Sequence, residues 1–161
     1  MTDALSLLRE FYTDKLAAVE RHIAGARQIA DYDANNTYQY VINREETQLS
    51  WIGQAVVALG GDVAAATPPA VRDIGKGPDA ARQVMREDAN DAQAFVDRWK
   101  ARVESLENAR QRAMLRIVLG ETLEQKRFFE QALAGDKDLL GIRTPAAGAR
   151  VGTVMADRWI E

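Results

Sequence analysis

Apolar side chains recur at every third or fourth position in four stretches of the chain, which is the spacing of helices that bury one face. The stretches run over residues 3–29, 41–61, 78–106 and 108–135. The connection between the first and second stretch is short, so these two helices should be antiparallel neighbours. The pattern therefore predicts an all-α fold in which four amphipathic helices form a bundle.

The segments between the predicted helices carry residues that favour turns. Residues 30–37 include two aspartates and two asparagines, which favour turns and helix caps. The paired glycines Gly60 and Gly61 fit a left-handed cap at the end of the second helix. Residues 62–77 hold a pair of prolines and show no helical period. We interpret this segment as a long crossover that leaves the second and third helices parallel.

The phase of the apolar positions predicts which face of each helix points inward. On the first helix this face comprises Leu5, Leu8, Tyr12, Leu16, Val19, Ile23 and Ala26. On the last helix it comprises Met114, Ile117, Val118, Glu121, Phe128 and Ala132. Both faces follow the three- and four-residue steps of a half-buried helix.

Three acidic residues fall on these inward faces. Glu45 lies on the second helix, Asp88 on the third and Glu121 on the fourth. Gln48 and Glu124 follow the first and last of them by three residues, so each pair shares a helical face. A carboxylate that faces a helical core is costly unless a cation or a metal ion pairs with it. Carboxylates that converge from several helices of a bundle form the geometry of a dinuclear metal site.

Composition narrows the classes of protein that fit. The chain has 161 residues, of which 47% are hydrophobic and 28% charged, as in soluble globular domains. Its formal net charge of −3 argues against a nucleic-acid partner. The absence of cysteine excludes disulfides and thiolate chemistry, and the motifs GxxxxGK[ST], GxSxG and HExxH are absent. No signal peptide or bilayer-length apolar stretch is evident, so we expect a cytoplasmic protein without a membrane partner.

The chain divides into one domain and an extension. Residues 1–135 hold the predicted bundle, and residues 136–161 follow as a C-terminal extension. The extension contains Leu139, Leu140 and Trp159, and it is too apolar for a free tail. We expect it to pack on the bundle or on a second subunit. The spare apolar positions favour a homo-oligomer, with a dimer preferred.

Two short motifs resemble those of the ferritin-like superfamily, which contains ferritins, bacterioferritins and rubrerythrins. That family carries Glu-x-x-His on its second and fourth helices, and its second helix ends near a Leu-Gly-Gly sequence. Here the corresponding residues are Glu45-Glu-Thr-Gln48 followed by Leu59-Gly60-Gly61, and Glu121-Thr-Leu-Glu124. The resemblance covers about residues 4–135, and it implies a ferritin-like four-helix bundle with a long crossover. Gln48 and Glu124 stand where the family has histidines.

The resemblance also implies a set of metal ligands and a chemistry. The family's site is a dinuclear iron or manganese centre with oxidase or peroxidase chemistry, in which Fe(II) is oxidised by oxygen or peroxide. The ligands implied here are Glu45, Glu121, Glu124, Asp88, Glu20 and Gln48. A glutamine amide is a weaker, neutral ligand than imidazole, whereas a second carboxylate still suits iron or manganese.

Some assignments within this set stay open. Glu87 competes with Asp88 on the third helix. On the first helix, the family's spacing points near Tyr12, whereas pairing about the turn near residue 33 places Glu20 and His22 level with Glu45.

A second hypothesis needs no metal. In it the inward acids are satisfied by arginine, lysine, tyrosine or tryptophan side chains, and the chain is a non-catalytic, degenerate ferritin-like bundle that serves as a dimerisation or interaction module.

Overall fold

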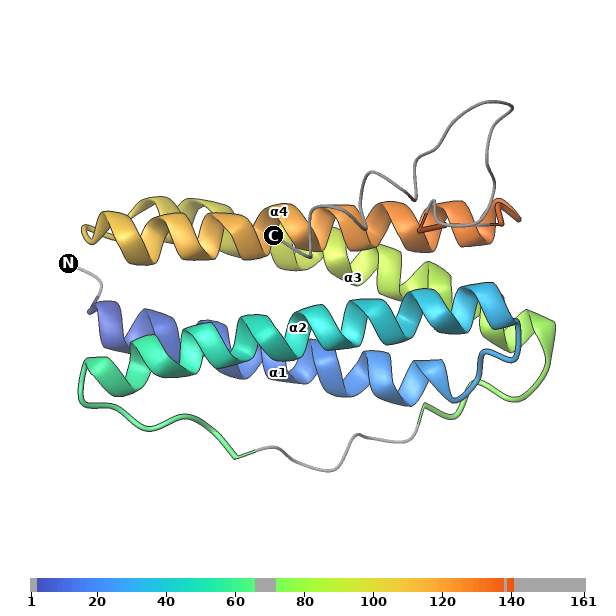
Figure 1. Ribbon diagram of the computed structural model, residues 1–161, viewed down its shortest axis with the longest axis horizontal. Coiled ribbons are helices and arrows are strands. Elements are labelled where there is room, and N and C mark those ends of the chain that lie inside the picture. Colours follow the sequence, from blue (N-terminus) through green and yellow to red (C-terminus); the bar gives the residue numbers. More distant parts are fainter. Residues whose placement is uncertain (1–2, 66–71, 138, 141–161) are drawn as a thin grey trace, which may run out of the picture.

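The computed structural model describes residues 3–65, 72–137 and 139–140. Over these residues the chain forms helices α1 (Ala4–Ala26), α2 (Tyr32–Ala58), α3 (Pro78–Glu104) and α4 (Ala109–Leu133). Figure 1 shows the helices side by side along the long axis of the molecule. The described residues contain no strand, which confirms the all-α prediction. The predicted crossover lies partly outside the described residues, and the predicted C-terminal extension lies mostly outside them.

The helices are arranged as two hairpins. α1 packs mainly on α2, and α3 packs mainly on α4. The contacts between hairpins, α1 with α3 and α2 with α4, are sparser. In Figure 1, α2 ends at the left of the bundle and α3 begins at the right, so these two helices run in the same direction.

The turn between α1 and α2 is shorter than predicted, and α2 begins earlier. Asp31 caps α2, since its side chain accepts a hydrogen bond of 3.0 Å from the backbone N–H of Ala34. The Asn35 amide donates to the carbonyls of Ala26 and Ile29, at 3.1 Å each, and so satisfies the end of α1. The polar residues that suggested a loop over 30–37 are therefore capping residues and the first turns of α2.

The end of α2 agrees with the prediction from its paired glycines. Gly60 adopts a positive φ of 79°. Its N–H donates to Val57 at 2.9 Å, and the N–H of Gly61 donates to Val56 at 3.1 Å. This pair of bonds is the Schellman motif, which satisfies the last carbonyls of a helix.

Two inward faces differ in phase from the prediction. On α1 the deepest line contains Leu8, Phe11, Lys15, Val19 and His22. The predicted residues Leu5, Tyr12, Leu16 and Ile23 are only half-buried. A charged lysine and a histidine occupy the deepest line because both find a buried partner across the bundle.

The inner face of α4 is rotated in a similar way. Its buried residues are Leu115, Val118, Leu119, Thr122, Gln125, Phe128 and Phe129. Ile117, which was predicted to face inward, is 52% exposed, and the Glu121 side chain lies at the edge of the core. The apolar periodicity of α4 is ambiguous by one position because apolar residues fill four of the five positions 115–119.

The core consists of two apolar clusters with a polar layer between them. One cluster centres on Phe11, which contacts the rings of Trp99 and Phe95 edge-on at 4.8 and 5.2 Å. The other centres on Tyr38 and Phe129, whose ring centroids are 5.0 Å apart. Along α1, α2 and α4, buried polar residues fall between the positions that build the two clusters.

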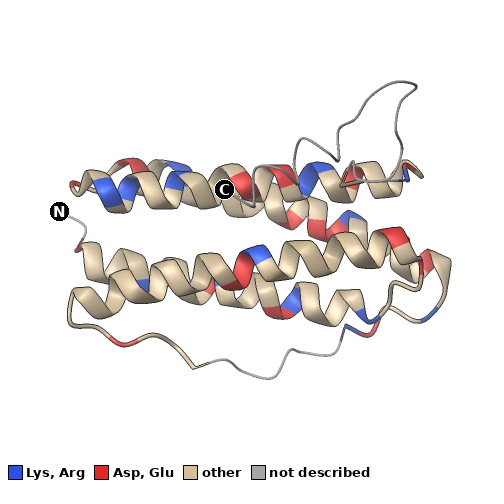
Figure 2. Ribbon diagram, viewed as in Figure 1, with Lys and Arg blue, Asp and Glu red and all other residues tan. Residues whose placement is uncertain are grey.

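Lysine, arginine, aspartate and glutamate are distributed along all helices of the described part, as Figure 2 shows. Among the described helices, none combines the length and the apolar content that crossing a bilayer requires.

Candidate functional site in the buried polar layer

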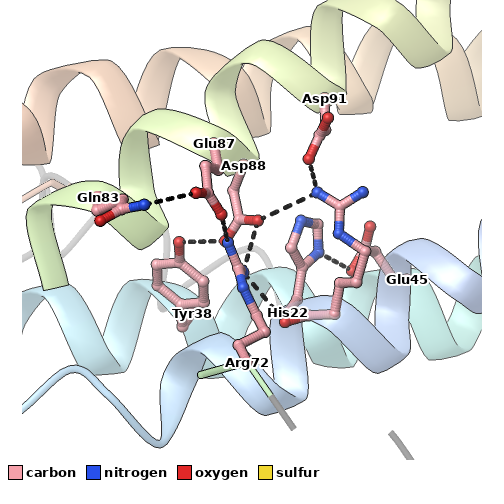
Figure 3. Close-up of polar contacts among 9 residues, drawn as sticks. His22, Tyr38, Glu45, Arg72, Gln83, Glu87, Asp88 and Asp91 are labelled. Atoms are coloured by element: carbon pink, nitrogen blue, oxygen red, sulfur yellow. Dashed lines mark hydrogen bonds and ion pairs between the residues drawn. The ribbon is translucent and has the colours of Figure 1, made fainter. Parts of the chain in front are cut away.

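Glu45 is the centre of the polar layer. It lies on α2 and is fully buried. Its Oε1 accepts a hydrogen bond from Lys15 Nζ at 2.7 Å, and its Oε2 lies 2.7 Å from His22 Nδ1. Both partners come from α1, seven residues or about two helical turns apart, so they share one face. Figure 3 shows the imidazole directed at the Glu45 carboxylate.

The two partners keep Glu45 ionised. Burial acts to raise the pKa of Glu45, but the nearby His22 and Lys15 outweigh it and lower the pKa to about 2. Lys15 is itself 1% exposed. Its Nζ also lies 3.5 Å from Thr122 Oγ1 and 5.5 Å from the centroid of the Phe95 ring. The layer therefore contains a buried, hydrogen-bonded ion pair.

Asp88 is a second buried acid with its own cation. Its carboxylate accepts from the Tyr38 hydroxyl at 2.6 Å and from Arg72 Nη1 at 2.8 Å. Arg21 Nη2 lies 3.7 Å away. Burial, and then the charge of Asp88, raise the pKa of Tyr38 well above its usual range. The phenol is therefore a neutral hydrogen-bond donor, as Figure 3 illustrates.

Arg72 reaches Asp88 because α1 has a glycine, Gly25, where the Arg72 side chain passes the helix. Arg72 Nη1 also donates to the Arg21 carbonyl at 3.3 Å, and Nη2 donates to Glu87 at 2.8 Å. A Cβ on Gly25 would lie 2.7 Å from Arg72 Nη1 and 2.8 Å from a methyl of Val84. The backbone of α1 therefore admits the guanidinium only where it carries no side chain.

Glu121 lies at the edge of the layer, and its carboxylate also accepts hydrogen bonds from side-chain nitrogens. Arg44 Nη2 donates to its Oε1 at 2.5 Å, and the Gln48 amide donates to its Oε2. The Glu121 side chain is 25% exposed. The hydrogen bond to Glu121 is the main cause that raises the pKa of Arg44. Gln48 thus connects α2 to α4 through a hydrogen bond.

The remaining predicted ligands lie elsewhere. The exposed Glu124 side chain pairs with Arg127 on its own helix at 3.4 Å. Glu20 lines the outer groove between α1 and α2. Over residues 3–65, 72–137 and 139–140, no three histidine, aspartate or glutamate side chains are grouped as a metal site requires.

The donor set does not fit a dinuclear iron or manganese centre. Such a centre needs carboxylate oxygens and imidazole nitrogens with lone pairs directed at the metal. Glu45, Asp88 and Glu121 instead direct their oxygens at Lys15, Arg72 and Arg44. A protonated lysine or arginine offers no lone pair to a metal ion, and its charge repels one.

Sequence patterns located the acids, and pairing about the turn near residue 33 placed His22 level with Glu45, but the lysine and arginine partners were missed. Lys15 does not belong to the apolar face predicted for the first helix, yet it lies in the deepest line of that helix. The signal that could have found it is its seven-residue spacing from His22, in line with Leu8 and Phe11. Arg72 lies outside the helices, where no periodicity indicates its partner.

Comparison with known proteins supports the fold and gives no function. No protein-family model matches the chain, and no curated protein matches it significantly. The structure is similar to a solved structure described as "Crystal structure of a conserved hypothetical protein, rv2844, from Mycobacterium tuberculosis". The TM-score is 0.64 at 17% sequence identity, over 82% of this chain and 100% of that chain.

Proposed function

We propose that the chain is a ferritin-like bundle that functions without metal, as a non-catalytic dimerisation or interaction module. The observation that carries this proposal is the 2.7 Å bond between Lys15 Nζ and Glu45 Oε1 in the centre of the polar layer. Glu45 is the residue that the family resemblance implies as a metal ligand. Here an ammonium group supplies the positive charge that a metal ion would otherwise supply.

The other two inward acids support the same proposal. Asp88 pairs with Arg72, and Glu121 pairs with Arg44. Each acid thus has its own cation from this chain. A bundle whose buried charges are already neutralised keeps its fold without a bound ion.

The outer face of the α1–α2 hairpin supports an interaction role. A groove of about 870 Å³ runs between the two helices, with a lining that is mainly apolar. Its lining includes Tyr12, Leu16, Ile23 and Leu49, and Val57, which is 62% exposed, stands on its edge. Exposed apolar patches of this kind mark interaction sites. The occupant that we propose is a second copy of the chain, packed hairpin against hairpin.

Metal binding tests the first half of the proposal. The purified chain is loaded anaerobically with Fe(II), and separately with Mn(II), and the bound metal per chain is measured after desalting. We expect far less than one ion per chain, because the acids are held by cations. Two irons per chain that are lost in Glu121→Ala and retained in Glu130→Ala, which changes an exposed acid outside the implied ligand set, would overturn the proposal.

Oligomeric state tests the second half. We expect a dimer in light scattering, which Val57→Arg should convert to a monomer because it places a charge on the apolar groove. The matched control is Ile117→Arg, which introduces the same charge at an exposed apolar residue outside the groove. A monomeric wild-type chain, or equal effects of the two substitutions, contradicts the proposed interface.

A further inference from the structure

A small cavity opens between α1 and α3 in front of the buried ion pair. Its volume is about 120 Å³. The buried part of its polar lining comprises Lys15, His22, Glu45, Thr122 and Gln125, which come from three helices. We propose that this cavity binds a small carboxylate anion. The inference goes beyond the proposed interaction role, since it assigns a ligand to the polar layer itself.

Gln125 is the feature that points to a ligand. It is 4% exposed, and its Oε1 has no hydrogen-bond partner among the described residues. Buried amide groups in folded proteins almost always have partners. Gln125 lines the cavity, and a half-turn of its amide would exchange the unpartnered oxygen for the NH2 group, which can donate to a carboxylate. A ligand in the cavity would supply the missing partner.

Lys15 adds a charged donor to the same cavity. An ammonium group has three N–H bonds to donate. Within the described part of the chain, its acceptors are Glu45 at 2.7 Å and Thr122 at 3.5 Å, the second of which is long. At least one N–H is therefore left for a ligand oxygen.

The charges around the cavity favour an anion over a cation. Lys15, Arg21 and Arg98 line it together with Glu45, Asp14 and Asp91. Both oxygens of Glu45 are already bonded. Arg98 and the Trp99 indole both donate to Oδ2 of Asp14, and Arg21 pairs with Asp91. The acids are therefore engaged, while Lys15, Gln125 and the arginines retain N–H groups to donate.

Size and shape restrict the anion. A volume of about 120 Å³ equals the share of about four liquid waters. Alanines at positions 17, 18, 92 and 94 form part of its apolar wall. A planar carboxylate with a short chain, such as acetate, fits this space and accepts several hydrogen bonds at once. A larger or branched acid does not fit.

The single histidine of the chain gives a direct readout, because His22 lines the cavity. Acetate is titrated into the full chain at constant ionic strength, and the ring resonances of His22 are followed. We expect a saturable shift with a roughly millimolar dissociation constant, as befits a ligand of this size. Acetamide, which has the same shape without the charge, should bind at least about tenfold more weakly.

Paired glutamine variants complete the test. Gln125→Leu removes the amide while keeping the volume, and should weaken acetate binding about tenfold. Gln111→Leu removes a glutamine of the same helix whose Oε1 is also unpartnered among the described residues but which lines a different groove, and should have no effect. If Gln125→Leu unfolds, Gln125→Met serves in its place. The absence of a saturable shift would show that the cavity holds water only, and this result, equal binding of acetamide, or equal effects of the two variants would overturn the proposal.

Discussion

Replacing Lys15 with methionine should lower the free energy of unfolding by about 3–5 kcal/mol, the typical cost of removing one partner of a buried ion pair. Methionine keeps the length of the side chain, so the loss is mainly electrostatic. Glu45 is fully buried and would retain only His22 as a hydrogen-bond partner. Without the ammonium, only His22 would remain to offset the burial of the Glu45 carboxylate.

Urea unfolding at pH 7, followed by circular dichroism, measures this loss. The matched control is Lys137→Met, which removes a surface lysine that lies at a similar distance, 2.8 Å, from its acid. Exposed pairs contribute less than about 1 kcal/mol, so the control should change little. The double variant Lys15→Met, Glu45→Met removes both buried charges and should recover most of the loss. A single variant that is no less stable than Lys137→Met contradicts the role of the ion pair.

The polar layer connects elements that the apolar contacts leave apart. α2 and α3 lie diagonally across the bundle, and the Tyr38 hydroxyl spans that diagonal to reach Asp88 at 2.6 Å. Gln48 and Arg44 connect α2 to Glu121 on α4. These bonds join one hairpin to the other at defined positions along the helices. A slip of one hairpin by a helical turn would leave buried charges without partners, so the layer favours one register.

The sequence was sufficient to predict the described helices and the burial of Glu45 and Asp88. The period of apolar residues located all the helices, and it placed Glu45 and Asp88 on inward faces, where both are fully buried. Period is a property of a single helix, so it can be recognised without knowledge of neighbours. For the same reason, an ambiguity of one position in α4 placed Glu121 deeper than it lies.

Pairing about the turn placed His22 level with Glu45, but the lysine and arginine partners of the acids could not be predicted from the apolar period. The bond between Lys15 and Glu45 depends on the rotation and register of α1 against α2, which no local pattern records. The pair between Arg72 and Asp88 further depends on the close approach that Gly25 permits. These partners decide which function the acids can serve, because the same carboxylates act as metal ligands or as ion-pair partners according to the groups that face them.

The acid stability of the fold should depend on Glu45. Its pKa is about 2 in the folded chain, against an ordinary value of 4.5 when the chain is unfolded. The unfolded state therefore binds a proton more readily than the folded state. The stabilisation is fully present above pH 4.5 and is lost as the pH falls toward 2. The shift corresponds to about 3 kcal/mol at neutral pH, of which roughly 2 kcal/mol should be lost by pH 3.

The variant Glu45→Gln isolates this contribution from those of the other acids. A glutamine cannot ionise, so the variant lacks the stabilisation at every pH. The difference in unfolding free energy between wild type and Glu45→Gln, measured in urea from pH 6 to pH 3, should therefore shrink steadily as the pH falls. Surface acids with lowered pKa values, such as Glu10 beside Arg102, are present in both proteins and cancel. A difference that stays constant over this range would show that Glu45 does not change its charge there. The Lys15 and His22 partners would then not be holding an ionised carboxylate in the core.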